Sequence, residues 1–217
     1  MTTLNHYTQQ PTSGGKPKKI IVLLHGYGSN GRDLISLAPY WQSAVPEAIF
    51  ISPDAPFPCE AGMGNDDMRQ WFSLAEYTSE KLLEGAQKAH PILDAYLDSL
   101  LGEYGLEEQD LALVGFSQGT MMSLYTGLRR KHQIAGILGY SGALIGADLL
   151  DSEEKPPIHL IHGENDSVVP VSAYHNAVKL LTQKGYLVSG HTTPMLEHSI
   201  DGQGIESGTK FLGEILS

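Results

Sequence analysis

The residues best suited to chemistry are a serine and the two glycines around it, in the pattern Gly-x-Ser-x-Gly over residues 115–119. The pattern alone is weak, because a chain of this composition contains about 0.2 such matches by chance. Its context is more specific: the apolar run 111–114 predicts a buried strand directly before it, and a helical pattern follows over 118–131. This strand–turn–helix setting predicts that Ser117 is a nucleophile for acyl-group chemistry.

A second serine lies in a similar but incomplete pattern. Ser141 follows Gly139 with the same spacing, but Ala143 replaces the second glycine and no clear helical pattern follows. The turn at a nucleophile is so sharp that side chains two residues to either side would collide with other backbone. We therefore expect Ser141 near the floor of the pocket and assign it no chemistry.

A serine nucleophile needs a histidine base, and the base needs a carboxylate to orient it. With this serine motif the carboxylate follows the serine along the chain and the histidine comes last, both on loops after later strands. The run 158–161 predicts such a strand, and Asp166 lies on the loop after it. Glu164 on the same loop is the alternative. Asp166 is favoured because Val168–Pro170 can pack beneath it and fix its direction.

Three histidines follow Asp166 along the chain: His175, His191 and His198. His175 falls within a helical pattern, and His191 lies at the end of a predicted strand, where a structural role is favoured. His198 lies between the last predicted strand and the final helix and is the predicted base. No pair of histidines has metal-ligand spacing with a third partner, so no metal and no other cofactor is expected.

The negative charge that develops on the attacked carbonyl oxygen needs two N–H donors. The backbone of Gln118, directly after the nucleophile, supplies one. The second should come from the loop 25–31, where glycines on both sides of Tyr27 allow a close backbone approach to a ligand. We predict the Tyr27 N–H as this donor. His25, at the end of the preceding strand, is assigned structural hydrogen bonding in preference to the role of a second base.

These residues require strands and helices that alternate along the chain. Unbroken apolar runs predict strands buried on both faces, at 20–24, 48–52, 111–114, 134–138, 158–161 and 186–189. Helical spacing predicts helices over 79–101, 118–131, 172–184 and 204–216, with a kink or break at Pro91. This alternation predicts an α/β fold whose mostly parallel central sheet is flanked by helices on both faces.

We expect one domain over 1–217, since the chain has 217 residues and no linker or repeat. Residues 1–17 are predicted to be a lead-in containing a short edge strand. Residues 53–70 are rich in Pro, Gly and Asp and lack periodicity. A loop of this length in a compact domain is usually functional or mobile, and we expect it to border the pocket.

Composition excludes several classes of function. The net charge of −11 argues against nucleic-acid binding, which needs clustered Lys and Arg. Cys59 is the single cysteine, so no internal disulfide can form and a reducing compartment fits. The N-terminus has no signal-peptide pattern and no apolar run reaches the length of a membrane span, so we expect a cytoplasmic protein without stable membrane insertion. The oligomeric state is open, with a homodimer as one alternative.

Taken in order along the chain, the motifs resemble those of a known family. They are Leu24-His25-Gly26-Tyr27-Gly28, Pro53-Asp54-Ala55-Pro56, Trp71-Phe72, the serine pentapeptide, His162-Gly163-x-x-Asp166-x-Val168-Val169-Pro170 and His198-Ser199. From about Lys18 to the C-terminus, the chain resembles the phospholipase/carboxylesterase family, which includes the acyl-protein thioesterases.

The resemblance implies an α/β-hydrolase without a large cap domain that hydrolyses carboxylic esters or thioesters of small-molecule or lipid-like substrates. It implies the same triad, Ser117, Asp166 and His198, and the same oxyanion donors. It also implies that the stretch before Trp71 shapes the acyl pocket and that Trp71 lines it, with core packing as the alternative. Trp71, Phe72 and His25 are the predicted substrate-binding residues.

The chain departs from the family pattern near this pocket. It has Ser73 where Asp is frequent, Cys59-Glu60 where Val-Thr is frequent, and Thr120 where Gly or Ala is common. These departures leave the triad intact but leave the acyl-protein substrate open. A short-chain esterase for small soluble esters is the alternative, and a non-catalytic binding module is disfavoured because all three triad residues are present.

Overall fold

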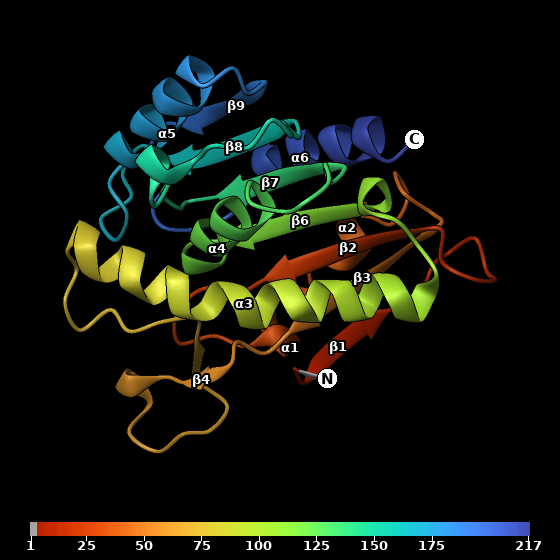
Figure 1. Ribbon diagram of the computed structural model, residues 1–217, viewed down its shortest axis with the longest axis horizontal. Coiled ribbons are helices and arrows are strands. Elements are labelled where there is room, and N and C mark those ends of the chain that lie inside the picture. The colour runs from red at the N-terminus through yellow and green to blue at the C-terminus, as the bar shows by residue number, and fades with distance from the viewer. Residues whose placement is uncertain (1–3) are drawn as a thin grey trace.

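The computed structural model describes residues 4–217, which form a central seven-stranded sheet (Figure 1). Along the sheet, the strand order is β1-β3-β2-β6-β7-β8-β9. Their bounds are β1 (His6–Gln9), β2 (Lys19–Leu24), β3 (Ala48–Pro53), β6 (Leu111–Phe116), β7 (Gly136–Tyr140), β8 (Ile158–Gly163) and β9 (Val188–Thr193). All neighbours pair in parallel except β1, which runs antiparallel to β3 at one edge. The predicted α/β-hydrolase architecture is confirmed.

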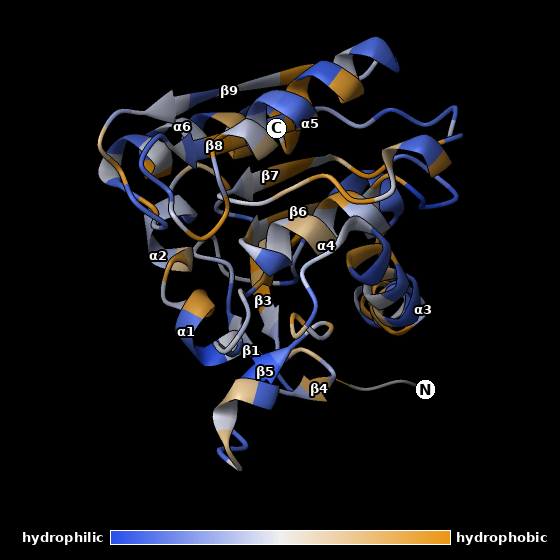
Figure 2. Ribbon diagram, turned by 90° about the vertical axis from the view of Figure 1, so that its left-hand side faces the viewer, coloured by the Kyte–Doolittle hydropathy of each residue, from blue (hydrophilic) through white to orange (hydrophobic). Residues whose placement is uncertain are grey.

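Helices cover both faces of this sheet. They are α1 (Gly31–Ile35), α2 (Ala38–Trp41), α3 (Ser79–Tyr104), α4 (Gln118–Gly127), α5 (Ser172–Gln183) and α6 (Gly202–Ile215). Helices α3, α4 and α5 pack on one face and α1, α2 and α6 on the other, as the edge-on view of Figure 2 shows.

The central strand β2 explains why the sheet needs both layers. Ile20, Val22 and Leu24 belong to the core under α3–α5, while Ile21 and Leu23 belong to the core under α1, α2 and α6. All five side chains are completely buried. An unbroken apolar run therefore fills two cores at once, because successive strand residues point to opposite faces.

Several element boundaries differ from the predicted ones. The sequence predicts a kink or a break at Pro91; helix α3 has no break and runs through Pro91 to Tyr104, with its apolar stripe buried in the core along its length. Strand β7 starts at Gly136 rather than residue 134, since Ala135 instead donates its N–H to the Leu111 carbonyl. Helix α4 ends at Gly127, four residues early. Strand β9 begins two residues late and extends to Thr193.

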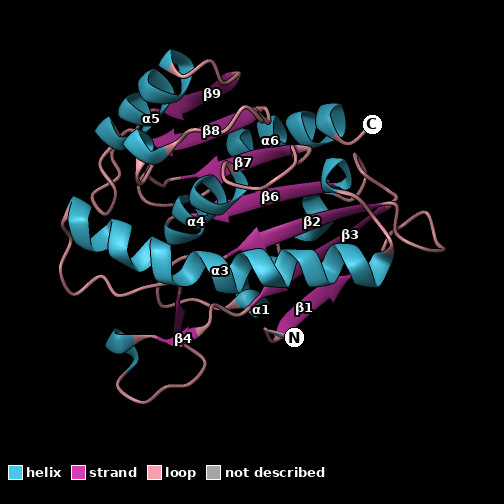
Figure 3. Ribbon diagram, in the orientation of Figure 1, coloured by secondary structure: helices cyan, strands magenta, loops and turns pink. Residues whose placement is uncertain are grey.

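The segment 53–70 contains more regular structure than predicted. Outside the main sheet, strands β4 (Phe57–Pro58) and β5 (Arg69–Gln70) pair as an antiparallel hairpin. Figure 3 shows β4 apart from the main sheet, and Figure 2 labels both strands. A short 3₁₀ helix, η1 (Glu60–Gly62), follows β4. The hairpin is bonded to the loop after β2: Gly28 donates to the Arg69 carbonyl, and Arg69 donates to the Ser29 carbonyl, both at 2.9 Å.

Beyond the early end of α4, the buried Arg130 guanidinium donates to Asp94 and Asp98 on α3 and to Glu108. Arg130→Met should lower the free energy of unfolding by about 3 kcal/mol, because it removes a buried cation and leaves Glu108, the most buried of its three carboxylate partners, unpaired. Urea denaturation measures this change. Lys210→Met, which breaks an exposed 3.9 Å pair with Glu214, should change stability by less than about 0.5 kcal/mol. Equal effects in the two variants would contradict the structural role of Arg130.

Candidate active site

Ser117 lies on a strained turn between β6 and α4, with φ 55° and ψ −117°. The predicted reason for the flanking glycines holds. A Cβ at Gly119 would overlap the Leu24 carbonyl, and a Cβ at Gly115 would overlap the backbone of Thr120. A non-glycine residue with positive φ is costly and persists only where the surroundings impose it. The turn presents the Ser117 side chain at the carboxyl edge of the sheet, directly before the first turn of α4.

The carboxylate of Asp166 is buried and oriented by its own loop. Its Oδ1 accepts the N–H groups of Val168 at 2.9 Å and Val169 at 2.8 Å. Its Oδ2 lies 2.7 Å from Nδ1 of His198. The side chain has no exposed surface. The structure therefore joins the predicted acid to the predicted base, and the valines orient the acid through their backbone N–H groups, whereas the Val168 side chain is exposed.

The imidazole of His198 is held on two sides. Asp166 engages Nδ1, and the ring of Phe116 packs against it with the centroids 4.9 Å apart. Since Phe116 directly precedes Ser117, this contact brings the histidine to the nucleophile turn. The other nitrogen, Nε2, is the one left to act as a base.

Glu164, His175 and His191, the alternatives for the acid and the base, occupy other positions. Glu164 is exposed and accepts the hydroxyl of Thr192 at 2.8 Å. His175 is on α5, as expected, and His191 lies within β9 rather than at its end. Ser141 is buried directly after β7, with φ 48°. Its hydroxyl is therefore shielded from solvent, and its place on the pocket floor stays a prediction.

His162 supports the acid and was given no role from the sequence. Its Nε2 donates to the Val169 carbonyl at 2.7 Å and lies 3.4 Å from Oδ2 of Asp166. Burial lowers the pKa of the His162 imidazole below its ordinary value, which favours the neutral ring. Its position four residues before Asp166, at the end of β8, was the available signal.

The predicted oxyanion donors lie on either side of Ser117. Gly26 is so close to the nucleophile that a Cβ there would be 3.3 Å from that of Ser117, and Tyr27 follows it. Gln118 begins α4, where backbone N–H groups have no partner within the helix. Within residues 4–217, neither the Tyr27 nor the Gln118 N–H donates a hydrogen bond. Both are therefore free for a ligand.

Two predicted substrate-binding residues are instead part of the core. His25 has no exposed surface: its Nδ1 donates to the Gly26 carbonyl at 2.7 Å and its Nε2 accepts the Ala55 N–H at 2.9 Å. Burial lowers its pKa to about 4. Trp71 is equally buried, and its indole N–H donates to the His25 carbonyl at 3.0 Å. The structural role predicted for His25 holds, and the assignment of either residue to substrate binding is wrong.

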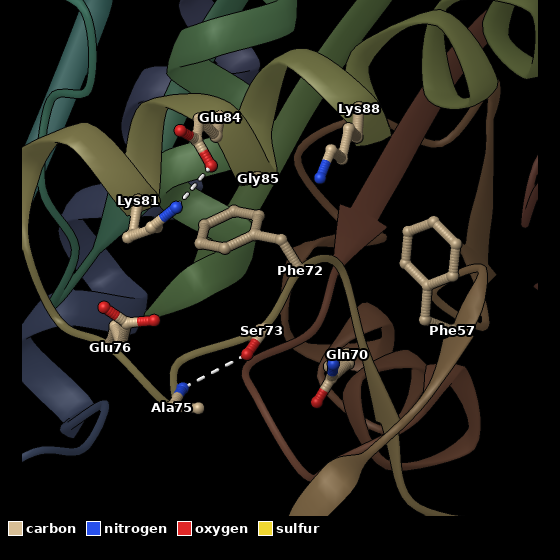
Figure 4. A pocket seen from close by; sticks show the side chains of 10 residues that line it. All are labelled: Phe57, Gln70, Phe72, Ser73, Ala75, Glu76, Lys81, Glu84, Gly85 and Lys88. Carbon is tan, nitrogen blue, oxygen red and sulfur yellow. Dashed lines mark hydrogen bonds and ion pairs between the residues drawn. The ribbon is translucent and has the colours of Figure 1, made fainter.

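Phe72 remains at a cavity. The cavity measures about 420 Å³ and lies between the hairpin, the segment after β5 and α3 (Figure 4). Its lining residues are Phe57, Gln70, Phe72, Ser73, Ala75, Glu76, Lys81, Glu84, Gly85 and Lys88. Tyr77, one residue beyond this wall, lies close enough to Asp166 that burial and the carboxylate charge together raise the pKa of its phenol. A direct link to the residues around Ser117 is the bond from the Gln118 side chain to the carbonyl of the lining residue Phe72, at 2.8 Å.

Comparison with known proteins identifies the family. A sequence profile described as Phospholipase/Carboxylesterase matches residues 8–216. The chain belongs to this family. Acyl-protein thioesterase 1 of Emericella nidulans is 28% identical over 215 residues, 90% of each protein. Acyl-protein thioesterase 1 of Schizosaccharomyces pombe is 31% identical over 162 residues, 69% of each.

Solved structures agree with this family. The crystal structure of esterase PE8 is 40% identical and covers 98% of this chain and 99% of its own, with a TM-score of 0.92. Zea mays acyl-protein thioesterase 2, at 24% identity and a TM-score of 0.79, shares the fold. The expected activity is confirmed in its general form: the protein is a serine hydrolase of carboxylic esters or thioesters.

Residues 4–217 contain no group of three or more His, Cys, Asp or Glu side chains able to hold a metal ion. None of the helices described there combines the length and apolar character needed to cross a membrane.

The buried neutral His25 makes stability depend on pH. Its folded pKa of about 4 lies below the unfolded value of 6.5, so its contribution is complete above pH 6.5 and is lost as pH falls toward 4. This loss amounts to about 3 kcal/mol. Urea titrations between pH 7 and 4 should show a smaller loss of unfolding free energy for His25→Gln than for the wild-type protein. His132→Gln, at an exposed histidine, is the control and should keep the wild-type dependence of that free energy on pH. An unchanged slope in His25→Gln would refute the assignment.

Proposed function

We propose that Ser117 forms an acyl-enzyme during ester or thioester hydrolysis, with His198 as base and Asp166 as the group that orients it. The observation that carries this proposal is the 2.7 Å contact between His198 and the buried Asp166, next to a serine on a strained turn. A carboxylate on Nδ1 fixes the histidine tautomer and stabilises the imidazolium that forms when Nε2 takes a proton.

The steps follow from these positions. His198 accepts the Ser117 proton as the oxygen attacks the acyl carbon, and the carbonyl oxygen becomes negative. The free N–H groups of Tyr27 and Gln118 stabilise that charge. His198 then gives the proton to the departing alcohol or thiol. Water repeats the sequence at the acyl-enzyme and releases the acid and free Ser117.

The 420 Å³ cavity is our candidate for part of the acyl site. Phe57 and Phe72 give it aromatic surface, and the Phe72 carbonyl accepts the side-chain amide of Gln118, the residue after Ser117, at 2.8 Å. The related acyl-protein thioesterases support a thioester substrate, and the likeness to esterase PE8 supports small esters as the alternative. The single buried cysteine supports a cytoplasmic location.

Ser117→Ala should remain folded and lose ester hydrolysis by about 10⁴-fold or more, because the nucleophile is absent. Hydrolysis of p-nitrophenyl butyrate and fluorophosphonate labelling followed by peptide mapping measure this. Ser141→Ala is the matched control and should keep both activity and labelling. Near-normal hydrolysis by Ser117→Ala, or no label on Ser117 in the wild-type protein, would rule out the proposed nucleophile.

Phe57→Ala should change chain-length preference. Phe57 is partly exposed at the cavity, so its removal takes away apolar contact without opening the core. For p-nitrophenyl hexanoate and octanoate we expect kcat/KM to fall by about fivefold, with acetate within twofold. Tyr40→Ala, at an exposed aromatic residue on α2, should leave the whole series unchanged. A uniform change across the series would remove the cavity from the acyl site.

A further inference from the structure

Glu60 connects three segments around the active site through one carboxylate. The hydroxyl of Tyr27 donates to its Oε1 at 3.2 Å. The hydroxyl of Ser73 lies 2.7 Å from Oε2, and the Leu74 N–H donates to Oε1 at 2.9 Å. Although partial burial opposes it, the hydrogen bonds from Ser73 and Leu74 hold the pKa of Glu60 below its ordinary value. The carboxylate is therefore charged at neutral pH.

The segment that Glu60 holds is also bound from the other side, by the side chain of Gln118. The Gln118 Oε1 accepts the Trp71 N–H at 2.8 Å, and its Nε2 donates to the Phe72 carbonyl at 2.8 Å. The amide is completely buried. Residues 71–74 thus contact both residues whose backbone N–H groups face the oxyanion, Gln118 directly and Tyr27 through Glu60.

Tyr27 needs such support more than Gln118 does. The Gln118 N–H is set by the start of α4, whereas Tyr27 lies on a loop between Gly26 and Gly28, and Gly28 has φ 79°. The carbonyl of the Gly26–Tyr27 peptide accepts His25 Nδ1 at 2.7 Å and the Ser29 N–H at 3.2 Å, so the peptide is anchored on its carbonyl side, and the Tyr27 side chain supplies a further anchor. The hydrogen bond from its phenol attaches this loop to Glu60.

We propose that Glu60 is a positioning residue: by binding the Tyr27 hydroxyl and the segment 73–74 together, it fixes the distance between the two oxyanion N–H groups. The inference rests on the proposed function, because it assumes that these N–H groups act on the substrate. The link adds a requirement that the triad alone does not impose.

We expect loss of the Glu60 carboxylate to weaken stabilisation of the transition state without weakening substrate binding. Donors that stabilise an oxyanion must be held close to their productive geometry before the charge develops. Loss of the Glu60 carboxylate should misplace the Tyr27 N–H without removing it. Ground-state binding in the cavity does not use this N–H, so KM should be spared.

The test compares Glu60→Met, which removes every acceptor at nearly constant size, with Glu60→Gln, which retains one oxygen. Glu60→Met should lower kcat for p-nitrophenyl butyrate by about tenfold and keep KM within twofold. It should also weaken the binding of a trifluoromethyl ketone inhibitor by about tenfold. Glu60→Gln should restore both to within about threefold of wild type. Glu206→Met, at an exposed glutamate on α6, is the control and should change neither.

A double-mutant cycle tests the route through Tyr27. Tyr27→Phe removes only the hydroxyl, so it should lower kcat by a similar factor, and the double variant Tyr27→Phe, Glu60→Met should be no worse than either single variant. Unchanged kcat in Glu60→Met, a loss in KM alone, or fully additive effects would overturn the proposal. Fluorophosphonate labelling of Ser117 separates the two levels: wild-type protein that does not label contradicts the proposed function, whereas labelled protein with an inert Glu60 contradicts only this inference.

Discussion

The turn at Ser117 depends on the absence of side chains at two glycines. Gly119 lies against the Leu24 carbonyl at the end of β2, and Gly115 lies against the start of α4. Because neither residue carries a Cβ, the backbone can pack this closely. Only Ser117 therefore lies between the end of β6 and the start of α4, whose first N–H groups point to the edge of the sheet. The positive φ of Ser117 is maintained by this packing. Every other part of the site is arranged around the position that results.

The parallel sheet then determines which loops can reach this position. Strand β6 pairs in parallel with β2 on one side, and β7 separates it from β8 on the other. Because all of these strands run in the same direction, the loops that follow them meet at one edge of the sheet. The loop after β2 contributes Tyr27, the turn after β6 contributes Ser117, and the loop after β8 contributes Asp166. His198 follows β9, the strand beside β8. For bringing these loops together, the shared direction of the strands matters more than their order along the chain.

Histidines in this protein serve two distinct purposes, separated by burial. His25 and His162 are buried, and burial lowers the pKa of both, so they act as neutral hydrogen-bonding groups within the framework. His198 keeps partial exposure, and one of its nitrogens remains available. His198 is thus the ring that we propose to move a proton, while the His25 and His162 rings are held in fixed hydrogen bonds beside Gly26 and Asp166.

By itself, the sequence determined the strand–helix alternation and the turn at Ser117, and it predicted Asp166 and His198 as the acid and base that we propose, because these follow from local periodicity and from spacing along the chain. It could not determine that Trp71 is buried against His25, or that His162 supports Asp166, since both depend on contacts between segments far apart or on the direction of a side chain. The link from Tyr27 through Glu60 to Ser73 has the same origin. Each of these residues has an ordinary local pattern, and only the fold brings their polar atoms within hydrogen-bonding distance.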